Sequence, residues 1–134
     1  MKELGGKVAI VTAASKGIGA RIARHLAAEG ASVVVNYVSS KRGADEIAAA
    51  ILKEAGRAIA IQADVANSAD VKRLFAVAKD AFGRLDVLVN NAGVFEFGPL
   101  EQVTEASFHK QLNANVLGTL LATQEAAEAS VFGS

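Results

Sequence analysis

Four short apolar runs, separated by segments of helical periodicity, constrain the fold of this chain more than any other feature. The runs are continuous rather than alternating, and they are rich in Val and Ile. Continuous runs of this length are typical of strands covered on both faces, which is the condition of a parallel sheet. The predicted strands are Val8–Thr12, Ser32–Asn36, Ala58–Gln62 and Val87–Asn90.

The segments after the first three runs carry apolar residues at helical spacing and end at glycine. Gly30, Gly56 and Gly83 are the predicted stops, and Ser68 is the predicted N-cap of the third helix. The expected apolar faces are Ile18, Ile22 and Leu26; Ile47, Ile51 and Leu52; and Val71, Leu74, Phe75, Ala78 and Phe82.

A longer helix is predicted to begin near Thr104, after a loop that contains the only proline, Pro99. Its expected apolar face comprises Phe108, Leu112, Val116 and Leu120. Strands that alternate with helices imply right-handed crossovers and a parallel sheet. We therefore expect a single α/β domain over residues 1–134, since a chain of this length has room for one.

Composition excludes several classes of function. The 14 basic residues balance 14 acidic ones, which leaves no charge excess for nucleic acid or a membrane surface. Cysteine is absent, which excludes disulfides, zinc ribbons and redox thiols. His25 and His109 are too far apart to suggest a metal site. No run approaches the roughly 20 apolar residues that span a bilayer, so we expect a soluble cytoplasmic protein.

The turn from the first strand into the first helix has the features of a phosphate-binding loop. It contains Ser15, Lys16, Ile18 and two glycines, Gly17 and Gly19. The glycines let the backbone approach an anion closely, and the helix start offers free N–H groups and a positive dipole end. An ordinary tight turn between a strand and a helix is the alternative interpretation. Placement after the first strand of a βαβ unit favours a dinucleotide site.

The end of the second strand indicates which dinucleotide is bound. A site for NAD usually has an acidic residue there, whose charge would repel a 2′-phosphate. This chain has the uncharged Asn36, followed by Ser39, Ser40 and Lys41, which could donate to a phosphate together with Lys16. The sequence therefore favours NADP(H) over NAD(H). The alternative is that a serine caps the second helix and that Lys41 faces solvent.

Two further segments follow strands where such a cofactor would pass. Asp64 could accept a hydrogen bond from the adenine amino group, and the N–H of Val65 could meet the ring. Asn91, Ala92 and Gly93 follow the fourth strand, where small residues would let a ribose lie against the main chain. Each segment could instead be a simple turn.

Taken together, these residues resemble the short-chain dehydrogenase/reductase family over the whole chain. The family's Thr-Gly-x-x-x-Gly-x-Gly motif is matched by Thr12, Gly17 and Gly19, with Ala13 in place of its first glycine. That alanine fits the turn if its φ is negative. Asp64 matches the adenine-contacting aspartate of the family. The family's two asparagine motifs are matched by Asn90-Asn91-Ala92-Gly93 and Asn115-Val116-x-Gly118.

The resemblance, strongest to the ketoacyl-reductase-like branch, implies a Rossmann-type doubly wound parallel sheet, with strand order 3-2-1-4 here. It also implies hydride transfer between a nicotinamide and a carbonyl or alcohol, with a catalytic role for Asn115. The family's catalytic Ser and Tyr-x-x-x-Lys belong to later elements, before which this sequence ends. Tyr37 and Lys41 fit that spacing by letter but follow the second strand, so we do not expect them to be catalytic.

These features predict that the chain alone is catalytically inactive. The alternative functions are a non-catalytic dinucleotide-binding module and an interaction partner. An unpaired fourth strand at the sheet edge also favours self-association. Glu96, Phe97 and Leu100 are candidates for the mouth of a substrate site, but nothing in the sequence identifies the substrate.

Overall fold

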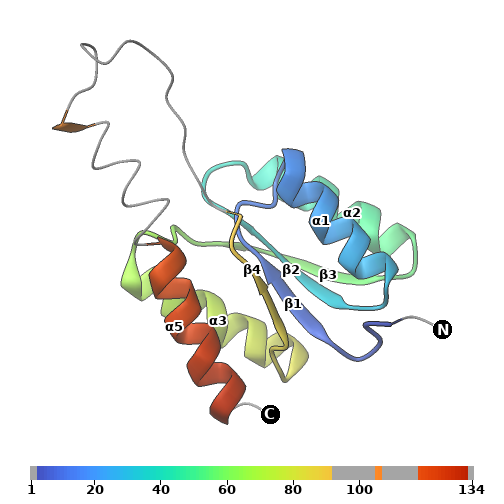
Figure 1. Cartoon of the computed structure of the whole chain (residues 1–134). Helices are drawn as coiled ribbons and strands as arrows, with labels where there is room; N and C mark the ends of the chain where they lie inside the picture. Colours follow the sequence, from blue (N-terminus) through green and yellow to red (C-terminus); the bar gives the residue numbers. More distant parts are fainter. Residues whose placement is uncertain (1–2, 92–104, 107–117, 133–134) are drawn as a thin grey trace.

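The protein is a parallel four-stranded sheet covered by helices on both faces (Figure 1). This computed structural model describes residues 3–91, 105–106 and 118–132. The strands are β1 (Val8–Val11), β2 (Ser32–Tyr37), β3 (Arg57–Gln62) and β4 (Val87–Val89). The helices are α1 (Gly17–Ala28), α2 (Lys41–Lys53), α3 (Ser68–Phe82) and α5 (Gly118–Phe132).

The strand order is β3-β2-β1-β4, as the sequence predicts. All three strand pairings are parallel, with Ile10 of β1 opposite both Val34 of β2 and Leu88 of β4. The chain moves outward from β1 in one direction through β2 and β3, and then crosses to the other side of β1 to form β4. Such a reversal opens a crevice at the carboxyl ends of the central strands, where open α/β sheets bind ligands.

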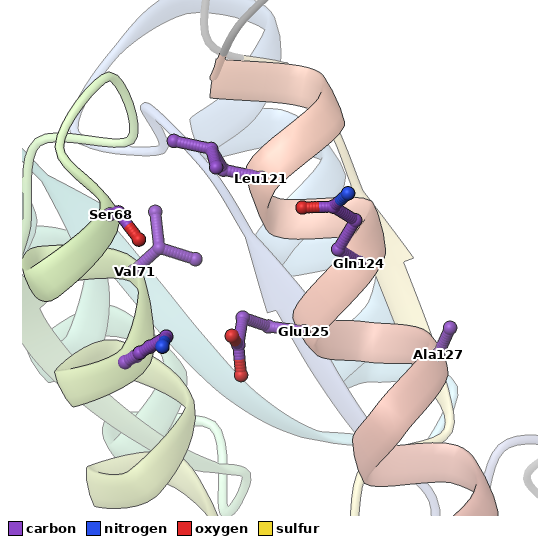
Figure 2. A pocket seen from close by; sticks show the side chains of 7 residues that line it. Ser68, Val71, Leu121, Gln124, Glu125 and Ala127 are labelled. Carbon is purple, nitrogen blue, oxygen red and sulfur yellow. The ribbon is translucent and has the colours of Figure 1, made fainter.

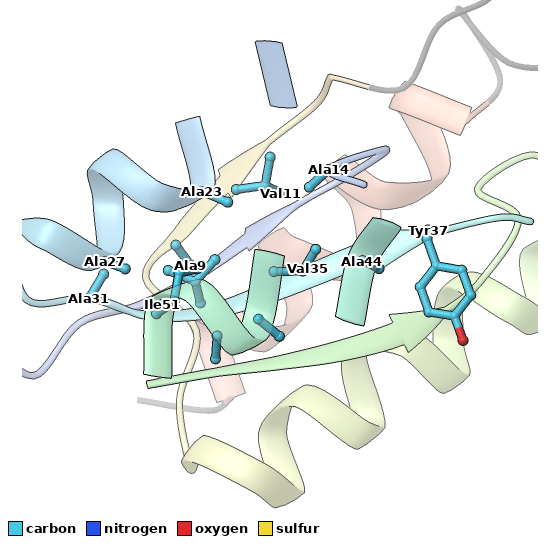
Figure 3. Close-up of a cluster of buried hydrophobic side chains, with 13 residues drawn as sticks. Ala9, Val11, Ala14, Ala23, Ala27, Ala31, Val35, Tyr37, Ala44 and Ile51 are labelled. Carbon is cyan, nitrogen blue, oxygen red and sulfur yellow. The ribbon is translucent and has the colours of Figure 1, made fainter. Parts of the chain in front are cut away.

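Each face of the sheet has its own apolar core, because successive strand residues point to opposite faces. Ala9 and Val11 of β1 face α1 and α2, where they join a cluster with Ala23 and Ile51 (Figure 3). Ile10 faces the other way and packs with residues of α3 and α5. The central strands are buried on both faces, which explains their continuous apolar sequence.

Where the predicted helical faces fall on described residues, the side chains are buried or half-buried except at three positions. Ile18, Leu52 and Leu120 are 69%, 56% and 53% exposed, whereas a core position was expected for each. The residues that reach the sheet from α5 include Leu121 and Ala122. Alanines make much of the contact between the helices and the sheet. A prediction based on the spacing of large apolar residues does not identify them. Thr104 and most of the predicted face of the long helix lie outside the described residues.

Two helix ends also differ in detail from the prediction. The N-cap of α3 is Asn67 rather than Ser68, and its side chain accepts a hydrogen bond from the N–H of Asp70. The helix α2 ends at Lys53, and the left-handed residue after it is Ala55 rather than Gly56. Gly83 ends α3 in the left-handed conformation, as predicted.

Asp86 fixes the start of β4 against β1. Its carboxylate accepts hydrogen bonds from the N–H of Val8 at 2.9 Å and from Arg84, and its own N–H donates to the Val8 carbonyl. Partial burial alone would raise the pKa of this carboxyl. The hydrogen bonds from Arg84 and Val8, with the charges of Arg84 and Lys7, outweigh burial and hold the Asp86 pKa below its ordinary value.

We expect Asp86→Asn to lower the free energy of unfolding by about 1–2 kcal/mol at neutral pH. Because the folded-state pKa is depressed, the carboxylate stabilises the fold above its unfolded pKa, and this contribution is lost as pH falls through the folded value. Stability of the variant should therefore depend less on pH between about pH 5 and pH 3. Chemical denaturation across that range measures both effects. The control Asp45→Asn removes only an exposed partner of Lys41 and should change little.

Candidate functional site

The loop between β1 and α1 contains two residues with left-handed backbone. Gly17 has a φ of 62°, and Ala13 has a φ of 51°. The condition under which Ala13 would fit the turn without strain, a negative φ, is therefore not met: the alanine adopts a left-handed conformation that only glycine adopts readily. Since a Cβ is unfavourable in this conformation, neighbouring contacts must hold Ala13 in place.

Asparagines from β2 and from the segment after β4 supply those contacts. The N–H of Ala13 donates to Oδ1 of Asn36 at 3.1 Å, and the carbonyl of Ala13 accepts from Nδ2 of Asn91 at 3.2 Å. The N–H of Asn91 donates to the hydroxyl of Thr12 at 2.9 Å. These bonds join the carboxyl ends of β1, β2 and β4 around one turn.

Gly19 is required by close packing rather than by its backbone angles. A Cβ at this position would lie 2.5 Å from Nδ2 of Asn91 and 2.6 Å from the carbonyl oxygen of Ala13. By contrast, a Cβ at Gly17 would meet nothing within 4 Å. The loop is thus packed on its inner side and open on its outer side, where a ligand could approach.

The start of α1 is suited to an anion. Its N-cap, Lys16, makes no side-chain capping bond, and the first turn contains no acidic residue. The start of α2 shares both properties, with Ser40 as the N-cap. The positive ends of two helix dipoles therefore point toward the same end of the sheet. At the start of α2 the N–H of Lys41 already donates to the carbonyl of Ser39.

A cavity of about 160 Å³ lies between the loop and the segment after β2. Ala13, Ser15 and Lys16 form one wall, and Val38, Ser39 and Ser40 form the other. The structure thus brings together Lys16 and the two serines that the sequence indicated as donors. The Lys16 ammonium forms no ion pair with the described residues.

Two of the predicted cofactor-binding residues, the donor Lys41 and the uncharged Asn36, do not line this cavity. Lys41 is exposed and bonds Asp45 of its own helix at 2.7 Å. That hydrogen bond and the charge of Asp45 raise the pKa of the Lys41 ammonium. Asn36 is 1% exposed, and its amide is bonded inside the protein. Both residues were predicted to bind the cofactor. In this structure the Lys41 ammonium is paired with Asp45, and the Asn36 side chain points into the protein.

Asp64 and Val65 follow β3 at the same edge of the sheet. Asp64 is exposed, and its Oδ1 accepts a hydrogen bond from the N–H of Ala66 at 2.9 Å. Val65 is buried. Oδ1 of Asp64 therefore has the turn role that the sequence allowed. The other carboxylate oxygen, Oδ2, accepts no hydrogen bond from the described residues.

Three predicted site residues, Ala92, Gly93 and Asn115, lie outside the described residues, as do Glu96, Phe97 and Leu100. Ile18 stands exposed at the start of α1, next to the two glycines, where it could contact a bound cofactor. Tyr37 ends β2 and packs in the core cluster beside α2 (Figure 3). Its side chain is buried, 9% exposed.

A larger hollow, of about 460 Å³, lies between α3 and α5. Figure 2 shows Leu121 and Glu125 of α5 facing Ser68 and Val71 of α3. The glycine-containing loop contributes nothing to it. Within the described residues no cluster of acidic or histidine side chains could hold a metal ion, and no helix there could cross a membrane.

Sequence reasoning missed the residues that support the cavity from behind. The carbonyl of Val38 accepts a hydrogen bond from the Gln62 side chain at 3.2 Å, and Gln62 in turn accepts one from Arg73 at 3.1 Å. Asn36 was predicted as a site residue, but its role in supporting the opposite wall through Ala13 was not. Neither group of hydrogen-bonded residues forms a recognisable sequence motif, because the partners lie in different helices, strands and loops.

Comparison with known proteins identifies related sequences. The family model described as short chain dehydrogenase matches residues 7–132. The chain is 56% identical over 128 residues to an uncharacterized oxidoreductase of Methylorubrum extorquens, covering 96% of this chain and 52% of that protein. It is 45% identical over 125 residues to a hydroxynaphthalene reductase-like protein of Metarhizium majus, covering 93% and 47%.

Solved structures agree with the sequence comparison. A short-chain dehydrogenase from Burkholderia cenocepacia in complex with NADP has a TM-score of 0.91 and 45% identity, over 95% of this chain and 52% of that one. A metagenomic blue fluorescent protein in complex with NADPH has a TM-score of 0.88 and 44% identity, over the same shares. This chain spans about half the length of the relatives it matches.

We expect Ala13→Gly to raise the free energy of unfolding by about 0.5–1 kcal/mol, because glycine adopts the left-handed conformation without strain. The control Ala49→Gly, at an exposed position inside α2, should lower it by about 1 kcal/mol. Thermal and denaturant unfolding measure both. A loss of stability in both variants would contradict the strained turn.

Proposed function

Because this chain belongs to the short-chain dehydrogenase/reductase family, we propose that it is the cofactor-binding portion of an NADP(H)-dependent oxidoreductase. Its reaction is hydride transfer between the nicotinamide and the carbon of a carbonyl or alcohol. A cytoplasmic location is part of this proposal.

The main support for NADP(H) as the cofactor is the cavity between the loop after β1 and the segment after β2. Lys16 supplies a cation, Ser39 and Ser40 supply hydroxyl donors, and none of the described residues that line the cavity is acidic. Charge-assisted hydrogen bonds of this kind hold a phosphate strongly, while a ribose hydroxyl gains much less from a cation. Two solved relatives were obtained with NADP or NADPH, which supports the same choice.

The remaining residues fit the rest of the dinucleotide. In this proposal the N–H groups at the start of α1 bind the pyrophosphate, with Gly17 leaving room for it. Asp64 and Val65 border the adenine, and Ile18 packs against the cofactor. Asn91, Ala92 and Gly93 lie along the nicotinamide ribose. When bound, NADPH supplies the hydride; the described residues bind and orient the cofactor.

The one Tyr-x-x-x-Lys spacing among the described residues, Tyr37 and Lys41, follows β2 and is not expected to take part in proton transfer. Asn115 is proposed as a member of the proton relay, which in the family also needs a Ser and a Tyr-x-x-x-Lys pair. We therefore expect the 134-residue chain to bind NADPH but to reduce no carbonyl compound. A spectrophotometric assay of NADPH oxidation tests this expectation. Turnover by the isolated chain would show that it already holds a complete catalytic set. Binding without turnover agrees with this proposal and also with a non-catalytic dinucleotide-binding module.

Calorimetric titration with NADPH and NADH tests the cofactor assignment. We expect NADPH to bind more tightly, and Lys16→Ala to weaken NADPH by about tenfold or more while changing NADH little. The control Arg42→Ala removes an exposed cation that pairs with Glu46 outside the cavity, and should leave both affinities unchanged. If Lys16→Ala and Arg42→Ala lowered the NADPH affinity equally, the cause would be general charge attraction and not a phosphate site.

Self-association is the proposed state of the isolated chain. Within the described residues β4 pairs on one side only, with β1, and Leu120 of α5 is exposed. Unpaired strand edges and exposed apolar residues favour association with a second chain. Sedimentation should show mass that rises with protein concentration, and Leu120→Lys should reduce it if α5 contributes. A monomer at every concentration would contradict the proposal.

A further inference from the structure

The Asn36 side chain lies where the sequence suggests a cofactor contact, but it faces the interior. It is the penultimate residue of β2 and is 1% exposed. Its Oδ1 accepts from the N–H of Ala13 at 3.1 Å, and its Nδ2 donates to the carbonyls of Ile61 and Ala63 at 3.2 and 3.1 Å. One side chain thus joins the loop after β1 to the end of β3.

We infer that Asn36 is a positioning residue for cofactor selection: it holds Ala13 in its left-handed turn and thereby sets the spacing of the two cavity walls. This inference rests on the proposed NADP(H) function. Ala13, Ser15 and Lys16 form one wall, so a change of the turn at Ala13 moves the Lys16 cation relative to the Ser39–Ser40 wall. Asn36 acts without touching the dinucleotide.

The main chain of Asn36 strengthens the same connection. Its carbonyl accepts from the N–H of Ala14 at 2.8 Å, so two successive N–H groups of the loop are bonded to one residue. On the other side, Asn91 holds the carbonyl of Ala13. The left-handed alanine is therefore fixed at both its N–H and its carbonyl, and Asn36 provides the only side-chain acceptor for that N–H among the described residues.

The hydrogen-bond pattern requires an amide at position 36. An amide has one acceptor oxygen and two donor hydrogens. The three shortest bonds of Asn36 use the oxygen once and Nδ2 twice, and the Tyr37 carbonyl is a longer fourth contact of Nδ2 at 3.5 Å. A carboxylate would place an oxygen against the carbonyls of Ile61 and Ala63, where no hydrogen could be shared. Asn36→Asp therefore should not create an NAD site, although an acidic residue near the end of this strand is the usual NAD signal.

The test compares variants by calorimetric titration with NADPH and NADH, with folding checked by circular dichroism. We expect Asn36→Ala to reduce the NADPH-to-NADH affinity ratio by about tenfold or more, because the 2′-phosphate loses its aligned donors. Adding Ala13→Gly should restore part of the ratio, since glycine adopts the turn without help. The control Asn67→Ala removes another asparagine hydrogen bond, at the cap of α3, and should leave the ratio unchanged.

Hydrogen exchange at the Ala13 amide gives a readout that needs no nucleotide. Exchange at this amide should become faster in Asn36→Ala than in the unaltered chain. If Asn36→Ala does not fold, the Asn36→Ala/Ala13→Gly double variant is compared with the Ala13→Gly single variant. Unchanged exchange, or an unchanged affinity ratio in a folded variant, would overturn the inference. Tighter binding of NADH than NADPH by Asn36→Asp would overturn it too. If the unaltered chain binds neither nucleotide, the proposed function fails, and exchange alone decides whether Asn36 holds the loop.

Discussion

The hydrogen bonds around Ala13 connect the carboxyl ends of all four strands. Asn36 links the turn to β2 and to the end of β3, and Asn91 links it to the segment after β4. These contacts compensate for the strain of an alanine with a φ of 51°. The start of α1, the open face at Gly17 and one wall of the small cavity all take their positions from this turn.

The two apolar cores make that turn possible. Alternate residues of β1 enter different cores, so the strand is clamped between α1 and α2 on one face and α3 and α5 on the other. A rigid sheet places loops within fractions of an ångström, which a phosphate site requires because charge-assisted hydrogen bonds depend steeply on distance. Gly19 shows how tight the placement is, since even one added carbon would overlap Asn91.

The candidate site was partly predictable. Lys16, Ser39 and the two loop glycines could be selected because residue type and place after a strand indicate anion binding. Lys41 was selected by the same reasoning, and Asn36 because it carries no negative charge; yet Asn36 is turned inward and Lys41 bonds Asp45. Residue type shows what a side chain can donate, but its direction depends on neighbours. For Lys41 the neighbour is Asp45, one helical turn further along α2. For Asn36 the neighbours are three backbone groups outside β2: the N–H of Ala13 and two carbonyls at the end of β3.

The order β3-β2-β1-β4 was implied only by the family resemblance. The sequence by itself determined the four strands, their parallel arrangement and the position of the loop. These follow from apolar periodicity and glycine placement, which are local properties of the chain. Only the tertiary structure decided the left-handed turn at Ala13, the inward direction of Asn36 and the meeting of Lys16 with Ser39. The reason is physical: the bonds that fix Ala13 come from residues 23 and 78 positions away, and folding alone brings those partners together.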